Sequence, residues 1–184
     1  MGGLTADAEP LPVAAVVLAA GAATRFGAPK QALLLDEVLG RLRASTEIGA
    51  IVVVVGAHEL ETDARLVSCP DWELGPGASL RCGLRVLADG TPAAAVILAD
   101  GPDLEPAAVD RVVAAWRAGA GDVVAASYDG VRGHPVVLGR AVWASVPDEG
   151  ARALEPVLVP CDDLGPPGDV DTPEDYAELE DDAG

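Results

Sequence analysis

The apolar residues of this 184-residue chain form short uninterrupted runs separated by polar or glycine-rich stretches. Runs rich in Val, Ile and Ala are typical of strands that are covered on both faces, as in a parallel sheet. They predict strands at 13–18, 51–55, 94–99, 123–127 and 157–159, a brief strand at 65–68, and a further strand after a turn near 130. The pattern therefore predicts a mostly parallel sheet.

Helical spacing of apolar residues occupies the intervals between these runs. Within 35–42 they recur at i, i+3, i+4 and i+7, which predicts a helix that Gly49 is expected to end. Similar spacing predicts helices near 80–87 and 106–117, a weakly helical stretch at 58–66, and two short helices between 143 and 154. A strand, a helix and a strand within 13–55 imply a right-handed parallel crossover.

These elements predict one α/β domain over residues 13–177, in three layers with the sheet between helices. Residues 1–12 have no periodicity and are expected to form a flexible tail, and 178–184 an acidic, solvated tail. Half of the chain is hydrophobic but only 3% is aromatic, so the core is expected to be aliphatic.

The formal charge of −18 argues against nucleic acid or an acidic membrane surface as a partner. A small anion remains compatible, because a few cations in a cleft act locally while distant carboxylates are screened. No apolar run approaches the roughly 20 residues of a membrane-spanning helix, and no basic leader precedes one, so we expect a cytoplasmic protein. Three widely spaced cysteines without a C-x-x-C pair predict buried free thiols.

A glycine-rich stretch, 18–30, follows the first predicted strand. Gly21 and Gly27 allow close approach of backbone N–H groups to an anion, and Arg25 and Lys30 supply positive charge. The residue types alone are equally compatible with a phosphate-cradling loop and with an ordinary turn, since neither the dinucleotide fingerprint nor the P-loop signature is present.

The fuller pattern, Leu18-Ala19-Ala20-Gly21 with Arg25-Phe26-Gly27 and Pro29-Lys30, resembles the opening signature of the molybdopterin nucleotidyltransferases, particularly their cytidylyltransferase branch. The resemblance implies a three-layer, Rossmann-like (GT-A-like) nucleotidyltransferase fold. It further implies Mg²⁺-dependent transfer of CMP from CTP to the phosphate of molybdopterin, with release of pyrophosphate. In this family alanine at position 20 accompanies cytidine. The implied catalytic residues are Arg25, Lys30 and Asp100, and the implied nucleotide site is Leu18, Ala19, Ala20, Gly21, Arg25, Lys30, Gly77 and Ser79.

Two acidic residues are expected to hold the metal ion. Asp100 ends a buried strand, where a hard divalent cation that bridges phosphates is expected, and Leu98-Ala99-Asp100-x-Pro102 resembles the family's metal-binding motif. Asp171 lies in a stretch that resembles the family's Asp-x-Asp-Thr-Pro-Glu-Asp ending, which implies a second carboxylate ligand. The family usually has a larger residue than Gly101, a departure that would widen the site or loosen its loop.

Two further motifs suggest contacts with the substrates. By resemblance, Gly77 and Ser79 contact the nucleotide, although the residue types alone favour a helix start with Ser79 as its cap. Gly133-His134-Pro135 resembles a motif placed where the second substrate approaches, which makes His134 a substrate-binding residue. As a lone histidine it is also compatible with a hydrogen-bonded imidazole of purely structural role.

The chain departs from the family after Lys30, where a Gly-x-Pro-Leu turn is missing. Loss of the turn should reshape one wall of the cleft and leaves two alternatives to the first interpretation. One is transfer to another small phosphorylated metabolite. The other is a non-catalytic, nucleotide-dependent maturation factor whose partner is an apo-molybdoenzyme.

Overall fold

A computed structural model describes residues 11–21 and 30–169, with side chains in the first helix from residue 34 onward. The sheet has seven strands in the order β3-β2-β1-β4-β6-β5-β7. The strands are β1 (Val13–Ala19), β2 (Ile48–Val55), β3 (Arg65–Ser68), β4 (Ala93–Leu98), β5 (Val123–Tyr128), β6 (Val131–Gly139) and β7 (Val157–Pro160). The helices are α1 (Lys30–Ala44), α2 (Pro76–Arg85) and α3 (Pro106–Arg117), with 3₁₀ turns η1 (Trp72–Leu74), η2 (Arg140–Ser145) and η3 (Gly150–Ala153).

The predicted mostly parallel sheet is confirmed. Strands β3, β2, β1 and β4 run parallel to one another, and β5 pairs in parallel with β7. Only β6 is antiparallel to its neighbours, β4 and β5, because it follows β5 through a tight turn rather than through a helix.

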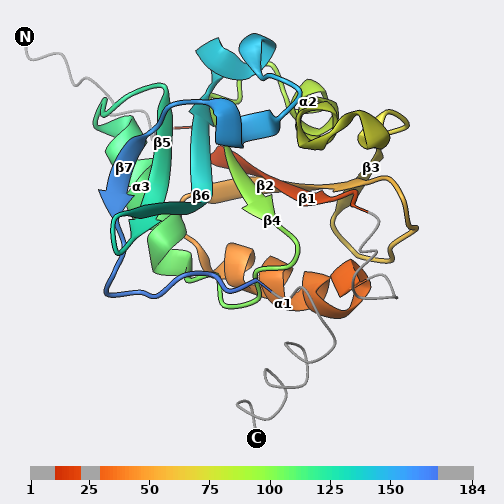
Figure 1. The fold of residues 1–184 in the computed structure, drawn as a ribbon, viewed down its shortest axis with the longest axis horizontal. Coiled ribbons are helices and arrows are strands. Elements are labelled where there is room, and N and C mark those ends of the chain that lie inside the picture. Colours follow the sequence, from red (N-terminus) through yellow and green to blue (C-terminus); the bar gives the residue numbers. More distant parts are fainter. Residues whose placement is uncertain (1–10, 22–29, 170–184) are drawn as a thin grey trace, which may run out of the picture.

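Helices cover both faces of the sheet and produce the predicted three layers (Figure 1). The apolar residues of α1 and α3 pack with Val13, Ala15 and Val17 of β1 on one face. The intervening residues Ala14 and Val16 pack with α2 on the other face. Alternate side chains of a strand point to opposite faces, so a strand buried on both faces must be apolar throughout.

Two local predictions are wrong. Gly49 does not end the first helix, which stops at Ala44, but lies inside β2. A Cβ there would lie 2.6 Å from the Cβ of Pro12, so the close approach of Pro12 leaves no room for a side chain at position 49. Residues 58–64 form no helix. Leu60 packs into the core, but this mostly polar stretch lacks the continuous apolar stripe that would stabilise a helix, and it passes as a loop into β3.

The prediction of three free thiols is also wrong. Cys69, directly after β3, and Cys82, on α2, form a disulfide with their Cα atoms 5.8 Å apart. They are 13 positions apart in the sequence, and the packing of α2 beside β3 brings them together. Cys161 is free and buried, as predicted. No helix in the described part of the chain is long and apolar enough to cross a membrane.

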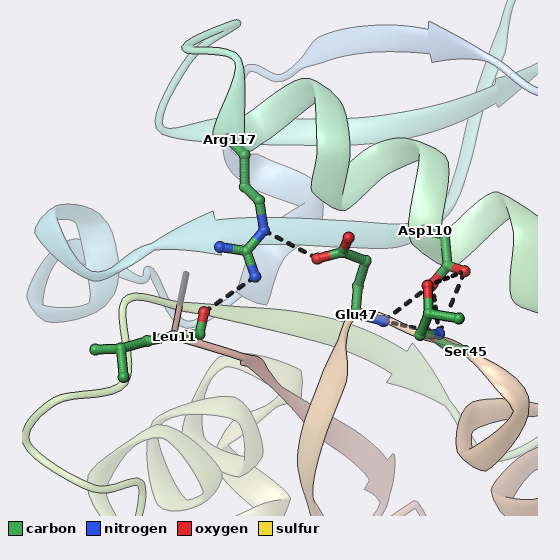
Figure 2. Close-up of polar contacts among 6 residues, drawn as sticks. Leu11, Ser45, Glu47, Asp110 and Arg117 are labelled. Atoms are coloured by element: carbon green, nitrogen blue, oxygen red, sulfur yellow. Dashed lines mark hydrogen bonds and ion pairs between the residues drawn. The ribbon is translucent and has the colours of Figure 1, made fainter. Parts of the chain in front are cut away.

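A polar cluster fastens α3 to the connection between α1 and β2 (Figure 2). The Asp110 carboxylate accepts hydrogen bonds from the Ser45 hydroxyl at 2.5 Å and from the hydroxyl and backbone N–H of Thr46 at 2.9 and 3.1 Å. Nearby, the Arg117 guanidinium donates to the Glu47 carboxylate at 2.9 Å and to the Leu11 carbonyl at 3.0 Å. The cluster therefore joins three segments that are distant in sequence.

Replacing Asp110 with alanine is expected to lower the free energy of unfolding by about 2 to 3 kcal/mol, since several donors lose a charged acceptor together. Urea unfolding followed by circular dichroism measures the loss. Glu37→Ala, which removes an exposed carboxylate that pairs with Arg41 within α1, is the matched control and should change stability by less than about 0.5 kcal/mol. Equal effects of the two substitutions would contradict this role for Asp110.

Candidate active site

A cavity of about 630 Å³ lies at the carboxyl end of β4. Its walls come from that strand end, from the turn between β5 and β6, and from residues 166–169, which run back past the loop that follows β4 (Figure 1). Most of the lining is apolar and includes Leu98, Leu104, Tyr128, Val131 and Pro167. The charged or polar residues in the lining are Asp129, Arg132, His134 and Asp169. The cavity suits a ligand with an uncharged, largely apolar body.

The structure places His134 in the wall of this cavity. Its Nδ1 lies 3.2 Å from the Val96 carbonyl oxygen, and because a carbonyl only accepts, Nδ1 carries the proton. The Tyr128 hydroxyl donates to the His134 carbonyl at 2.9 Å. A Cβ on Gly133 would lie 2.8 Å from the Tyr128 ring, which explains the glycine before the histidine. The hairpin thus holds the imidazole in one orientation.

Burial lowers the pKa of His134 most strongly, and the hydrogen bond to the Val96 carbonyl partly opposes it. The positive charge of Arg132 lowers the pKa further, and the negative charge of Asp100 raises it least of these effects. The imidazole is therefore neutral near pH 7, with Nε2 as a lone-pair acceptor. In this state His134 accepts a hydrogen bond from a hydroxyl or N–H group and does not neutralise a phosphate.

This lowered pKa predicts a pH dependence of stability. The folded protein binds the His134 proton less readily than the unfolded chain, so the contribution to stability is complete above about pH 6.5 and is lost as pH falls below that value. His134→Gln should therefore lose less stability between pH 7 and pH 5 than the unaltered protein does in urea unfolding. His58→Gln, which removes the other histidine of the chain, is the control. An equal loss of stability between pH 7 and pH 5 in His134→Gln and in the unaltered protein would show that folding does not lower the pKa of His134.

Asp100 lies two residues after the end of β4, in the loop that borders the cavity. Its negative charge raises the pKa of His134 slightly. The strand end is fixed because the Ala99 N–H donates to the Leu18 carbonyl at 3.2 Å. A carboxylate at this edge of a parallel sheet fits a hard divalent cation. Asp169 lines the same cavity, but Asp171 lies outside the described residues, and the described residues contain no group of three or more potential metal-ligating side chains.

The structure accounts for Gly101, where the family usually has a larger residue. A Cβ there would lie 3.2 Å from both the Cβ and the carbonyl oxygen of Pro167. The Asp103 N–H donates to that same carbonyl at 2.9 Å. Gly101 thus lets residues 166–168 close tightly on the loop beside Asp100, instead of loosening it.

The first predicted nucleotide-binding residues lie at the end of β1, beside Asp100. Leu18 accepts the Ala99 N–H, and the Ala20 carbonyl accepts the N–H of Ala57 at 3.1 Å. The backbone that leads to Gly21 is therefore tied to the ends of both neighbouring strands. Arg25 lies outside the described residues, as does the side chain of Lys30, whose backbone begins α1.

Gly77 and Ser79 lie in the first turns of α2. Gly75 precedes the helix as its N-cap, so the alternative of Ser79 as the cap is wrong. Ser79 is only 4% exposed, and its hydroxyl makes no hydrogen bond with a described residue. The Gly77 N–H donates to the Asp148 carbonyl at 2.9 Å, so Gly77 also serves in packing.

Sequence reasoning missed Tyr128, Arg132 and Pro167 as parts of the site. Tyr128 and Arg132 lie shortly before Gly133-His134, and this proximity to a recognisable motif was the only signal in the sequence that would have identified them. Pro167 reaches the site through a contact with residues more than 60 positions earlier, which no local pattern reports.

A mostly parallel sheet with a cavity and a carboxylate at its carboxyl edge is the arrangement in which open α/β proteins bind their ligands. The family model of the MobA-like NTP transferase domain matches residues 15–158, and the chain belongs to this family. No curated protein matches the chain.

Solved structures of three proteins support the fold. The homologue of Rv0371c from Mycobacterium sp. strain JC1 is 24% identical with a TM-score of 0.75, over 92% of this chain and 96% of that one. Rv0371c from Mycobacterium tuberculosis is 25% identical with a TM-score of 0.72, over 92% and 98%, and a second structure of it is a manganese complex. The molybdopterin-guanine dinucleotide biosynthesis protein A from Archaeoglobus fulgidus is 14% identical with a TM-score of 0.64, over 93% and 98%.

Proposed function

We propose that this nucleotidyltransferase transfers CMP from CTP, with Mg²⁺, to the phosphate of molybdopterin or the molybdenum cofactor and releases pyrophosphate. The observation that carries the proposal is the cavity with His134 in its wall, which opens beside Asp100 and the end of β1. The molybdopterin name of one structural neighbour and the family match support the acceptor. Ala20 supports CTP over GTP, by the resemblance described above.

In the proposed reaction a phosphate oxygen of the acceptor attacks the α-phosphorus of CTP. A new O–P bond forms, the bond to the β-phosphate oxygen breaks, and pyrophosphate leaves with that electron pair. The second pKa of a phosphate monoester is about 6, so the nucleophile is ionised at pH 7 and needs no general base. Catalysis then consists of positioning and charge neutralisation.

The chain's own residues divide this work. Arg25 and Lys30 offset the charge of the triphosphate, and backbone N–H groups near Gly21 cradle it. Gly77 and Ser79 contact the base or ribose, where the buried hydroxyl of Ser79 has no partner among the described residues. Asp100 and Asp171 would hold Mg²⁺, which when bound supplies positive charge to the phosphates.

The acceptor occupies the cavity in this proposal. Its apolar walls take a flat ring, and the neutral His134 imidazole accepts a hydrogen bond from it through Nε2. Arg132, the one arginine in the described lining, directs its donors to backbone carbonyls and not to an acceptor phosphate. The acceptor phosphate would therefore point out of the cavity toward Asp100 and the triphosphate. An apo-molybdoenzyme in the cytoplasm would receive the product.

Pyrophosphate release tests the function directly. The protein is incubated with CTP, GTP or ATP, with and without Mg²⁺, and with molybdopterin or other phosphorylated acceptors. Turnover with CTP and molybdopterin supports the proposal. Turnover only with another nucleotide or another acceptor would show that the proposed substrates are wrong. Nucleotide binding without turnover, seen as a thermal shift, would favour a non-catalytic maturation factor instead.

A further inference from the structure

A short backbone segment, residues 146–154, links the cavity to the first turn of α2. It contains η3 and the residues before it, and arginines from two different elements hold it. Arg132 holds it from β6, on the cavity side. Arg81 holds it from α2, on the side proposed for the nucleotide.

The Arg132 guanidinium donates three hydrogen bonds to backbone carbonyls of this segment. Its Nη1 donates to the carbonyls of Leu154 at 2.7 Å and Arg152 at 3.1 Å, and its Nη2 donates to the Ala151 carbonyl at 2.7 Å. Burial lowers its pKa. A guanidinium that caps three carbonyls of one turn fixes that turn relative to the cavity wall and has few donors left for a substrate.

The opposite end of the segment is fixed to α2. Arg81 donates to the Val146 carbonyl at 2.9 Å and to the Asp148 carboxylate at 2.8 Å. The Gly77 N–H donates to the Asp148 carbonyl at 2.9 Å, and a Cβ on Gly77 would lie only 1.9 Å from the Pro147 carbonyl oxygen. Because backbone meets backbone here, a shift of 146–154 must shift the first turn of α2.

We propose that Arg132 is a positioning residue that sets the nucleotide-binding turn, residues 75–79, through segment 146–154 and thereby couples the acceptor cavity to nucleotide affinity. The proposal rests on the proposed function in assigning 75–79 to the nucleotide. Coupling between two sites is reciprocal, so an acceptor that orders the hairpin around Arg132 tightens nucleotide binding, and the nucleotide tightens acceptor binding.

The test compares Arg132→Gln and Arg132→Lys in the full-length protein, with CTP and Mg²⁺ but without an acceptor. We expect Arg132→Gln to raise the Kd for CTP about tenfold, within the range typical of coupled sites, although Arg132 does not contact the nucleotide in our proposal. Arg132→Lys, which keeps a donor for the carbonyls, should recover part of the affinity. Arg152→Gln is the matched control, because its exposed side chain has no hydrogen bond or ion pair among the described residues.

A second measurement separates this inference from the proposed function. Amide hydrogen exchange without nucleotide should be faster at Gly77 and its neighbours in Arg132→Gln than in Arg152→Gln, whether or not the protein binds CTP. A double-mutant cycle with Asp148→Ala should give less than additive effects on that exchange, since both side chains hold one segment. Unchanged exchange at residues 75–79 in Arg132→Gln, or a Kd for CTP within twofold of the control's, would overturn the coupling. Failure of the unaltered protein to bind any nucleotide, with faster exchange retained, would overturn the assignment of 75–79 to the nucleotide.

Discussion

Replacing Asp100 with asparagine is expected to lower the rate of pyrophosphate release at least a hundredfold, about 3 kcal/mol in the activation free energy. The substitution keeps the shape of the side chain and removes one negative charge from the carboxyl edge of the sheet, where the metal ion is proposed to neutralise the triphosphate. Stability should change little, because Asp100 follows β4 rather than packing in the core. Pyrophosphate release under saturating CTP and acceptor measures the effect.

The Mg²⁺-dependent part of the CTP thermal shift should disappear in the same variant. Asp89→Asn is the matched control, since it removes one carboxylate from an exposed position before the start of β4, at the other end of that strand from Asp100. A variant at Asp100 that keeps the full Mg²⁺-dependent shift and its turnover would remove Asp100 from the metal site. The same pair of measurements on Asp171→Asn tests the second proposed ligand.

Replacing Gly77 with alanine is expected to cost about 2 to 4 kcal/mol of unfolding free energy. The added Cβ would lie 1.9 Å from the Pro147 carbonyl oxygen and 2.8 Å from the Asp148 Cα, and backbone atoms cannot rotate away as a side chain does. Overpacking of this kind typically costs 1 to 3 kcal/mol, and loss of the hydrogen bond to Asp148 adds about 1 kcal/mol. Urea unfolding measures the sum.

Gly40→Ala is the matched control for Gly77→Ala. Gly40 lies on an exposed position of α1 with no atom within 4 Å of the added Cβ, so alanine there should stabilise the protein by about 0.5 to 1 kcal/mol. The two substitutions are chemically identical, so opposite signs of their effects on the free energy of unfolding would assign the loss at Gly77 to its contact with residues 147–148. A Gly77→Ala variant as stable as the unaltered protein would show that segment 146–154 moves away from α2 at little cost. That result would contradict the proposal that this segment sets the position of residues 75–79.

The described strands and helices agree closely with the local hydrophobic pattern. The helix predicted at 106–117 and the strand at 65–68 have the observed bounds, and the aliphatic periodicity of 35–42 corresponds to a fully buried face of α1. These features are predictable because a period of two or 3.6 residues is a property of neighbours in the chain. Where a local pattern was weak, as in 58–64, the prediction of helix failed.

The placement of the site motifs at the carboxyl edge of the sheet also follows from the sequence, since Asp100 and the glycine-rich stretch each come directly after an apolar strand. The family and the class of reaction follow from the same motifs. By contrast, the disulfide between Cys69 and Cys82, the close contacts at Gly49 and Gly101, and the Asp110 cluster could not be predicted from the sequence. Each depends on which segments become neighbours in space.

The amino-acid sequence by itself thus determined the sheet, its helices, the family and the position of Asp100 and Gly21 at the carboxyl edge of the sheet. Only the tertiary structure decided the shape of the cavity, the lowered pKa of His134 and the hydrogen bonds of Arg132 to the carbonyls of 151–154. The physical reason is the separation along the chain between the residues that produce each feature. Hydrophobic periodicity acts over a few residues, whereas a pKa, a cavity wall and a clamped backbone arise from groups about 20 to 70 positions apart, whose proximity is set by the order of strands in the sheet.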